Sequence, residues 1–218
     1  MSQTRLVEVR QKVLNKNDLA ARVLRERFEQ ARVCTVSLVS SPGSGKTAFL
    51  ELLLSMLRDQ YKVAALVGDL ATENDAMRLA RSQVPVKQIA TGTVCHLDAR
   101  MITAALEGWI CDELDFLFIE NVGNLVCPAS YDLGERARAV LLSVTEGEDK
   151  PLKYPTIFHT ADIALLTKTD LAEAVEFSVE LARRNIHTVR PGMRIIETSA
   201  KTRAGMPEVV EWLRTLRC

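Results

Sequence analysis

The stretch SSPGSGKT fills residues 40–47, directly after the apolar run at residues 33–39 and before a segment of helical spacing that begins at Ala48. A strand, a loop of small residues and a helix start, in this order, can cradle a phosphate group. The glycines let backbone N–H groups converge on the anion, and the helix N-terminus adds positive potential. We expect Lys46 to reach the β- and γ-phosphates and the Thr47 hydroxyl to ligate Mg²⁺. The stretch therefore predicts a P-loop for a nucleoside triphosphate.

One position departs from the Gly-x-x-x-x-Gly-Lys-Ser/Thr pattern, because Ser40 stands where the first glycine is expected. Serine is small, so we still expect the loop to form. The residues expected to contact the nucleotide here are Ser41, Gly43, Ser44, Gly45, Lys46, Thr47 and Ala48.

Beyond residue 33, apolar β-branched runs alternate with amphipathic segments, which indicates parallel strands joined by helices. Such crossovers are right-handed, so we expect an α/β P-loop NTPase fold with a doubly wound, mostly parallel sheet flanked by helices. The expected strands are residues 33–39, 62–67, 86–89, 116–119, 139–144, 163–166 and 194–196. The expected helices are residues 48–58, 76–82, 99–109, 172–184 and 207–216.

Residues 1–30 carry apolar side chains at helical spacing among charges and contain no Gly or Pro. They predict an N-terminal helical extension, which residues 15–18 could divide into two helices. Residues 31–218 are expected to form one P-loop domain with inserted loops. We find no internal repeat and no sign of a further domain.

The charge balance is even, with 28 Lys plus Arg against 28 Asp plus Glu. This balance predicts no nucleic-acid partner and no binding to an anionic membrane. No apolar run approaches the length of a membrane span, and the first ten residues do not resemble a secretory leader. Together with five scattered cysteines, these features predict a cytoplasmic, reducing location.

A second nucleotide element reads Thr-Lys-Thr-Asp at residues 167–170, directly after an apolar run. A carboxylate at Asp170 can accept hydrogen bonds from the N1–H and the exocyclic amine of guanine, and adenine offers no such pair of donors. Ser-Ala-Lys follows the last expected strand and would form another wall of a guanine pocket. The residues expected around the base are Thr167, Lys168, Asp170, Ser199, Ala200 and Lys201.

Acidic residues follow two other expected strands at the edge where ligands of such sheets bind. Asp69 is a candidate for the Mg²⁺ shell, directly or through water. Asp75 could orient the attacking water, or it could simply be an acid favoured at a helix N-terminus. Glu120 and Gly123 resemble the Asp-x-x-Gly switch of GTPases with Glu substituted, so Gly123 is expected to contact the γ-phosphate. With Lys46, these residues make up the expected catalytic set.

Cys95, His96 and Cys127 suggest a second chemistry. A thiolate together with an imidazole suits Zn²⁺ or Ni²⁺. A free cysteine is also often a small buried apolar residue, so composition leaves both interpretations open. Three ligands leave a Zn²⁺ sphere one short, which would call for a water molecule or a partner subunit.

Taken together, five motifs resemble the hydrogenase/urease nickel incorporation GTPases known as the HypB family. They are SSPGSGKT at residues 40–47, GD and TENDA at 68–76, TG and CHLDA at 91–99, ENVGNLVCP at 120–128 and VTEGEDKPLKYP at 144–155. The resemblance implies a dimerising SIMIBI-type GTPase that hydrolyses GTP to GDP and regulates nickel delivery during [NiFe]-hydrogenase maturation. It also implies a Ni²⁺ or Zn²⁺ site at a dimer interface, built from Cys95, His96 and Cys127.

The resemblance further implies partners: a homodimer that depends on nucleotide or metal, a small HypA-like nickel-binding accessory protein and the hydrogenase large subunit. No Cys-rich or His-rich tract precedes the GTPase domain, so we expect nickel transfer rather than storage. One alternative is a small-molecule kinase with the same phosphate loop, although it gives the three metal-type residues no role. Another is a urease-type nickel GTPase, but Pro128 and Ala129 follow Cys127 where that relative has Cys-Pro-His.

Overall fold

The computed structural model describes residues 2–69, 74–109 and 113–217. Its centre is a sheet of seven strands in the order β3-β2-β4-β1-β5-β6-β7, in which every neighbouring pair is parallel. The strands are β1 (Cys34–Ser40), β2 (Val63–Asp69), β3 (Val86–Ala90), β4 (Phe116–Glu120), β5 (Ala137–Ser143), β6 (Ile163–Thr167) and β7 (Arg194–Glu197). All seven predicted strands are present, and their ends differ from the prediction by at most two residues.

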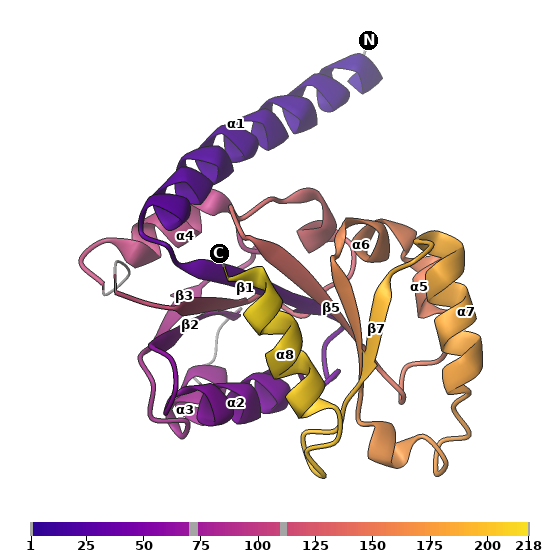
Figure 1. The fold of residues 1–218 in the computed structure, drawn as a ribbon. Coiled ribbons are helices and arrows are strands. Elements are labelled where there is room, and N and C mark those ends of the chain that lie inside the picture. The colour runs from indigo at the N-terminus through magenta and orange to yellow at the C-terminus, as the bar shows by residue number, and fades with distance from the viewer. Residues whose placement is uncertain (1, 70–73, 110–112, 218) are drawn as a thin grey trace.

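Helices cover both faces of the sheet (Figure 1). On one face α2 (Lys46–Leu57), α3 (Asn74–Ala80) and α8 (Met206–Leu216) share a core with the strands. On the other face α1 (Ser2–Gln30) and α4 (Ala99–Leu106) bury one cluster, and α6 (Pro155–Thr160) and α7 (Val179–Val189) bury a second. The strand alternation divides these cores, since Phe116 and Phe118 of β4 face α2 while Leu117 and Ile119 face α1 and α4.

The first helix, α1, is a single helix of 29 residues, so the predicted division at residues 15–18 does not occur. Its C-terminal half packs on α4, through Ala21, Leu24 and Phe28. Its first turns reach beyond the body of the molecule (Figure 1). Within the described residues, no helix combines the length and the apolar character that a membrane span requires.

Two helix predictions need correction. The helix expected at residues 172–184 begins only at Val179 and continues to Val189. Glu176 has a positive φ of 53°, which interrupts helical geometry, and the Ser178 side chain then caps the new helix by accepting from the Leu181 N–H. The helix expected at residues 99–109 ends at Leu106, ahead of Gly108 with a φ of 64°.

Four short elements were not predicted. They are α5 (Lys150–Lys153), α6, and the 3₁₀ helices η1 (Cys127–Ser130) and η2 (Thr169–Leu171). Each spans six residues or fewer, which is too short for an apolar repeat of helical period to show in the sequence.

Candidate functional site: a phosphate loop beside a thiol and imidazole cluster

The phosphate loop connects β1 to α2 at the carboxyl edge of the sheet. Gly43 has a φ of 73° and Gly45 a φ of 91°, a backbone region that residues with a Cβ rarely adopt. The Ser44 hydroxyl donates to the Ser40 hydroxyl at 2.6 Å, and Ser40 donates to the Ser41 carbonyl at 2.8 Å. Ser40, the departure from the glycine pattern, is thus accommodated by hydrogen bonds within the loop.

The end of β4 lies against the start of α2. The Thr47 hydroxyl donates to Glu120 Oε1 at 2.7 Å, and Glu120 is only 2% exposed. Burial raises the pKa of Glu120 to about 7, although the charge of Lys46 and the Thr47 hydrogen bond oppose this rise. The charge of Asp75 adds to the rise, so the first turn of α3 is close enough for its carboxylate to act on Glu120.

The same corner offers a suitable environment for Mg²⁺. Glu120 Oε2 is buried and, among the described residues, has no hydrogen-bond partner. Mg²⁺ prefers hard oxygen ligands, and a buried carboxylate oxygen beside a threonine hydroxyl fits that preference. Asp69 ends the neighbouring strand β2, as predicted, whereas the residues 72 and 73 of the TENDA motif lie outside the described part of the chain.

Gly123 lies directly against the phosphate loop. A Cβ at this position would be 2.9 Å from both Cα and N of Pro42, which is closer than such atoms approach in folded proteins. Only glycine allows this approach of the two backbones. The predicted switch segment and the phosphate loop are therefore in contact.

The residues predicted for the base lie at the other side of the loop. Thr167 donates to the Ser44 carbonyl and Lys168 Nζ donates to the Gly43 carbonyl, each at 2.7 Å. Farther along, the buried Ser199 donates to Asp170 Oδ1 at 2.6 Å, while Asp170 itself is exposed. The two elements predicted to select guanine thus meet each other, and the adjoining Ala200 and Lys201 are half-buried and exposed.

Cys95, His96 and Cys127 come together as predicted. Their ligand atoms lie within 4.8 Å of one another, and the two sulfur atoms are 2.9 Å apart. The His96 ring stacks on Tyr131 with centroids 3.9 Å apart, and its buried Nδ1 has no hydrogen-bond partner among the described residues. Burial lowers the pKa of His96, with Asp98 acting in the opposite direction, so the neutral imidazole that metals require is favoured. Two sulfurs and an unpaired ring nitrogen fit Zn²⁺ or Ni²⁺.

Comparison with known proteins identifies the family of this chain. Residues 34–197 match the family described as CobW/HypB/UreG, nucleotide-binding domain. The chain is 48% identical over 218 residues to the hydrogenase maturation factor HypB of Escherichia coli K12, covering all of this chain and 75% of that protein. The chain belongs to the HypB family.

Solved HypB structures show the same fold. The crystal structure of the hydrogenase maturation factor HypB from Archaeoglobus fulgidus superposes with a TM-score of 0.87 at 37% identity, covering 94% of this chain and 100% of the other. The structure of HypB from Helicobacter pylori in complex with nickel gives a TM-score of 0.86 at 40% identity, covering 93% and 97%. The predicted P-loop NTPase fold and the predicted family are both confirmed.

Two asparagines that sequence reasoning missed connect the parts of this HypB-family site. Asn121, next to Glu120, accepts from the Leu97 N–H at 3.0 Å and so joins the switch segment to the loop that carries Cys95 and His96. Asn124 accepts from the Val126 N–H at 2.8 Å and donates to the Cys95 carbonyl at 3.5 Å. Both asparagines lie within the motif at residues 120–128, but asparagine is common in turns, and the sequence does not show which loops they connect.

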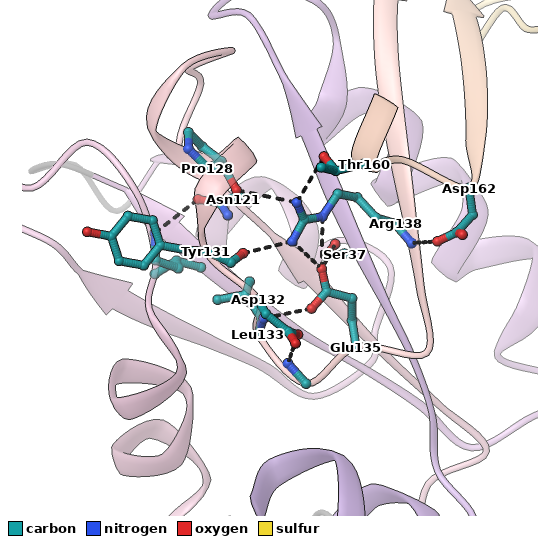
Figure 2. Close-up of polar contacts among 12 residues, drawn as sticks. Ser37, Asn121, Pro128, Tyr131, Asp132, Leu133, Glu135, Arg138, Thr160 and Asp162 are labelled. Atoms are coloured by element: carbon teal, nitrogen blue, oxygen red, sulfur yellow. Dashed lines mark hydrogen bonds and ion pairs between the residues drawn. The ribbon is translucent and has the colours of Figure 1, made fainter. Parts of the chain in front are cut away.

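A buried ion pair lies beneath the loop of Cys127 in the HypB-family chain (Figure 2). Arg138 of β5 bonds Glu135 at 2.7 Å, and their side chains are 9% and 6% exposed. Arg138 also donates to the carbonyl of Pro128 within η1, to the carbonyl of Tyr131 directly after η1, and to the Thr160 hydroxyl. Glu135 accepts from the Ser37 hydroxyl and the Leu133 N–H. The pair satisfies the polar groups of an irregular loop in the interior.

The motif at residues 144–155, to which the sequence assigned no chemistry, also reaches this site. A cavity of about 460 Å³ separates the phosphate loop from the loop of Cys127. Its walls include Pro42, Val126, Glu146, Lys150 and Tyr154. This motif therefore borders both the phosphate loop and the loop of Cys127.

Proposed function

We propose that this HypB-family chain hydrolyses GTP to GDP and uses the reaction to regulate nickel delivery during [NiFe]-hydrogenase maturation. The observation that carries the proposal is that one chain segment both contacts the phosphate loop and carries a candidate metal ligand. Glu120 contacts Thr47 in the phosphate loop, and Cys127 lies seven residues later on the same segment. The family membership and the nickel-bound Helicobacter pylori relative support it.

GTP would extend from the phosphate loop to Asp170. Lys46 and the backbone N–H groups of the loop would hold the phosphates, while Thr47 and Asp69 would hold Mg²⁺. Bound Mg²⁺ would supply charge neutralisation for the transferred phosphoryl group. The chain's own contribution is positioning: Asp75 would orient the attacking water, and Gly123 would place a backbone N–H toward the γ-phosphate.

Nickel or zinc would bind Cys95, His96 and Cys127. Three protein ligands leave one tetrahedral position free, which a second copy of the chain or an acceptor protein would use. We propose a homodimer that depends on nucleotide or metal, and transfer between a small HypA-like accessory protein and the hydrogenase large subunit in the cytoplasm. The Nδ1 of His96 has no hydrogen-bond partner in the described part of the chain, which supports a metal ligand here, since a buried imidazole nitrogen without a partner is costly.

Native mass spectrometry of the full chain tests the proposal. We expect separate mass increments for one GDP and for Ni²⁺, and a larger share of dimer with a non-hydrolysable GTP analogue and metal. His96→Ala should lose the metal and retain GDP, whereas Lys46→Ala should lose the nucleotide. His187→Ala is the matched control, because His187 is exposed and contacts only the Met193 carbonyl among the hydrogen bonds that the structure shows.

Two outcomes would overturn the proposal. Metal retained at full stoichiometry by His96→Ala would remove the metal centre. A preference for ATP, with phosphate transferred to a metabolite, would favour the small-molecule kinase instead.

A further inference from the structure

The inference concerns Asn17, which lies in the middle of α1 and is only 2% exposed. Asparagine is unfavourable in a helix interior, and burying an amide without hydrogen bonds is costly. The neighbouring positions Asn15, Lys16 and Asp18 are all exposed, as expected for the polar face of such a helix. The burial of Asn17 therefore has to be explained by its partners.

Both halves of the Asn17 amide are used, and each half binds a different loop. Oδ1 accepts from the Ala99 N–H at 2.9 Å, and Nδ2 donates to the Asp132 carbonyl at 2.9 Å. Ala99 is the first residue of α4 and follows the loop of Cys95 and His96. Its N–H belongs to the first turn of a helix, where no intrahelical acceptor exists.

The Asp132 carbonyl belongs to the other loop. Cys127 lies five residues earlier, and Tyr131, the adjacent residue, stacks on the His96 ring. One amide from α1 thus spans the two chain segments that supply all three candidate metal ligands. Its two bonds connect both segments to the same residue of α1.

Two further contacts hold α1 against the second loop. Arg25 bonds both carboxylate oxygens of Asp132, at 2.7 and 2.8 Å. Gly134 lies so close to the helix that a Cβ there would be 2.7 Å from the Ala21 carbonyl oxygen. These contacts fix the position of α1 relative to this loop. Through its bond to the Ala99 N–H, Asn17 also connects α1 to the end of the loop that carries Cys95.

We infer that Asn17 is a positioning residue for the metal site, through which α1 holds the Cys95–His96 loop and the Cys127 loop at the spacing needed for metal binding. The inference rests on the metal centre proposed above and deepens it. Groups that orient metal ligands without touching the metal typically contribute about 10- to 100-fold to metal affinity. The helix predicted to be an extension of the GTPase domain is by this inference part of the metal site.

Variants of Asn17 in the full chain provide the test. Asn17→Leu keeps the approximate size and loses both hydrogen bonds, while Asn17→Asp keeps the acceptor for Ala99 and loses the donor to Asp132. Asn15→Asp, two residues away and exposed, is the matched control for the added charge. Ni²⁺ and Zn²⁺ affinities would be measured by competition with a chromophoric chelator, the nickel–thiolate absorption band by spectroscopy, and GDP affinity with a fluorescent analogue.

We expect Asn17→Leu to weaken metal binding by about 10-fold or more. We also expect it to alter the nickel–thiolate band and to leave GDP affinity within about twofold, a factor that corresponds to less than ~0.5 kcal/mol. Asn17→Asp should show a smaller loss, and Asn15→Asp none. Unchanged metal affinity and an unchanged band in Asn17→Asp and in a folded Asn17→Leu would overturn the inference.

A second measurement covers the case in which Asn17→Leu does not fold. Hydrogen exchange of the wild-type chain should show slower exchange at the Ala99 amide when Zn²⁺ is bound, and no such slowing would contradict the inference. If the wild-type chain binds neither metal, the proposed function fails. If wild type and Asn17→Asp bind equally well, only the role of Asn17 fails.

Discussion

Two carboxylates at opposite ends of the proposed nucleotide site, Glu120 and Asp170, lie in different environments. Glu120 is buried, and burial raises its pKa to about 7 while one of its oxygens has no partner among the described residues. Such a group is stabilised as an anion when a cation binds beside it. Asp170 is exposed and is oriented by the Ser199 hydroxyl at 2.6 Å, so it is directed by one hydrogen bond and accessible to a ligand.

Exchanging Asp170 for asparagine tests the base. Asp170→Asn replaces a carboxylate oxygen by an amide donor, which matches the C2 carbonyl of xanthine and opposes the C2 amine of guanine. We expect affinity for GDP to fall by about 100-fold or more and affinity for xanthosine diphosphate to rise. Titration of the fluorescent nucleotides measures both.

The exposed Asp59 supplies the control for that exchange, since Asp59→Asn should alter neither affinity. Equal GDP affinity in Asp170→Asn and wild type would contradict the assignment of Asp170 to guanine.

Residue type singled out Cys95, His96 and Cys127 as unusual, and the resemblance to the HypB family then made them candidate metal ligands. The same reasoning could not find Asn17, Asn121 or Asn124. Asparagine is common in turns and caps, and only the fold brings Asn17 to its partner Asp132, 115 positions away. Residues that orient ligands are therefore largely hidden in a single sequence.

At the scale of elements, the strands were predictable and the short helices were not. Buried parallel strands are continuous apolar runs, so each of the seven strands shows in the sequence. The start of α7 depends instead on a hydrogen bond to the Ser178 side chain and on the Glu148 carboxylate, which accepts from the Ser178 N–H across 30 positions. Such a tertiary contact moved the helix start away from residue 172.

The buried ion pair between Arg138 and Glu135 leads to a prediction about the stability of the protein. Arg138→Met leaves Glu135 buried without its charge partner, so we expect a loss of about 3–5 kcal/mol in the free energy of unfolding. The double variant Arg138→Met with Glu135→Leu removes both charges and should recover a substantial part of that loss. Urea denaturation of the four proteins in this cycle measures the coupling.

A double variant as unstable as the sum of its single variants would contradict the claim that the two charges act as a pair. Metal affinity measured on the same folded proteins should fall with Arg138→Met, because Arg138 bonds the Pro128 carbonyl within η1 and the Tyr131 carbonyl directly after it.

The Asp132 carboxylate, which Arg25 of α1 binds, should make the stability of the protein depend on pH. Burial by itself would raise the pKa of Asp132, but the hydrogen bond and charge of Arg25 and the Gly134 N–H hold it below its ordinary value, with Glu135 also facing the carboxylate. A depressed pKa stabilises the fold above the unfolded value of ~3.9, and this stabilisation is lost as pH falls through the folded value.

We therefore expect Asp132→Asn to be less stable than wild type near neutral pH, and this difference to disappear as the pH falls below the depressed folded-state pKa of Asp132. The pair is partly exposed, so the difference should be ~1 kcal/mol or less. Urea denaturation across this range checks it, and a difference that grows toward low pH would contradict the sign.

For the whole molecule, the order of the strands determines which loops lie next to the phosphate loop. The connection after β1 runs toward β2 and the connection after β5 runs the opposite way toward β6, so the phosphate loop lies at a switch point, with β4 and β5 on either side of β1. Glu120 contacts Thr47, and the next residue, Asn121, contacts the loop of Cys95. Adjacent residues of one strand end thus join the phosphate loop to the loop that carries two of the candidate metal ligands.

This connection predicts reciprocal linkage. If a GTP analogue in place of GDP changes Ni²⁺ affinity by some factor, Ni²⁺ must change the preference for the analogue over GDP by the same factor. We expect a factor of about 5–150, typical of coupled sites. Calorimetric titration of each ligand, with and without the other, measures both sides of the cycle.

Asn121→Ala should reduce that factor toward one, since it removes the acceptor for the Leu97 N–H. Metal affinity that is identical with GDP and with the GTP analogue would contradict the coupling between the centres.

The 2.9 Å separation of the two sulfur atoms also bears on oxidation. An oxidant that accepts two electrons would convert Cys95 and Cys127 to a disulfide, each thiol giving up one proton and one electron. That single bond would remove both thiolate ligands together, and a bound metal would shield them by occupying the same lone pairs. Metal binding to Cys95 and Cys127 would therefore compete with their oxidation. Its extent would depend both on the supply of metal and on the redox potential of the surroundings.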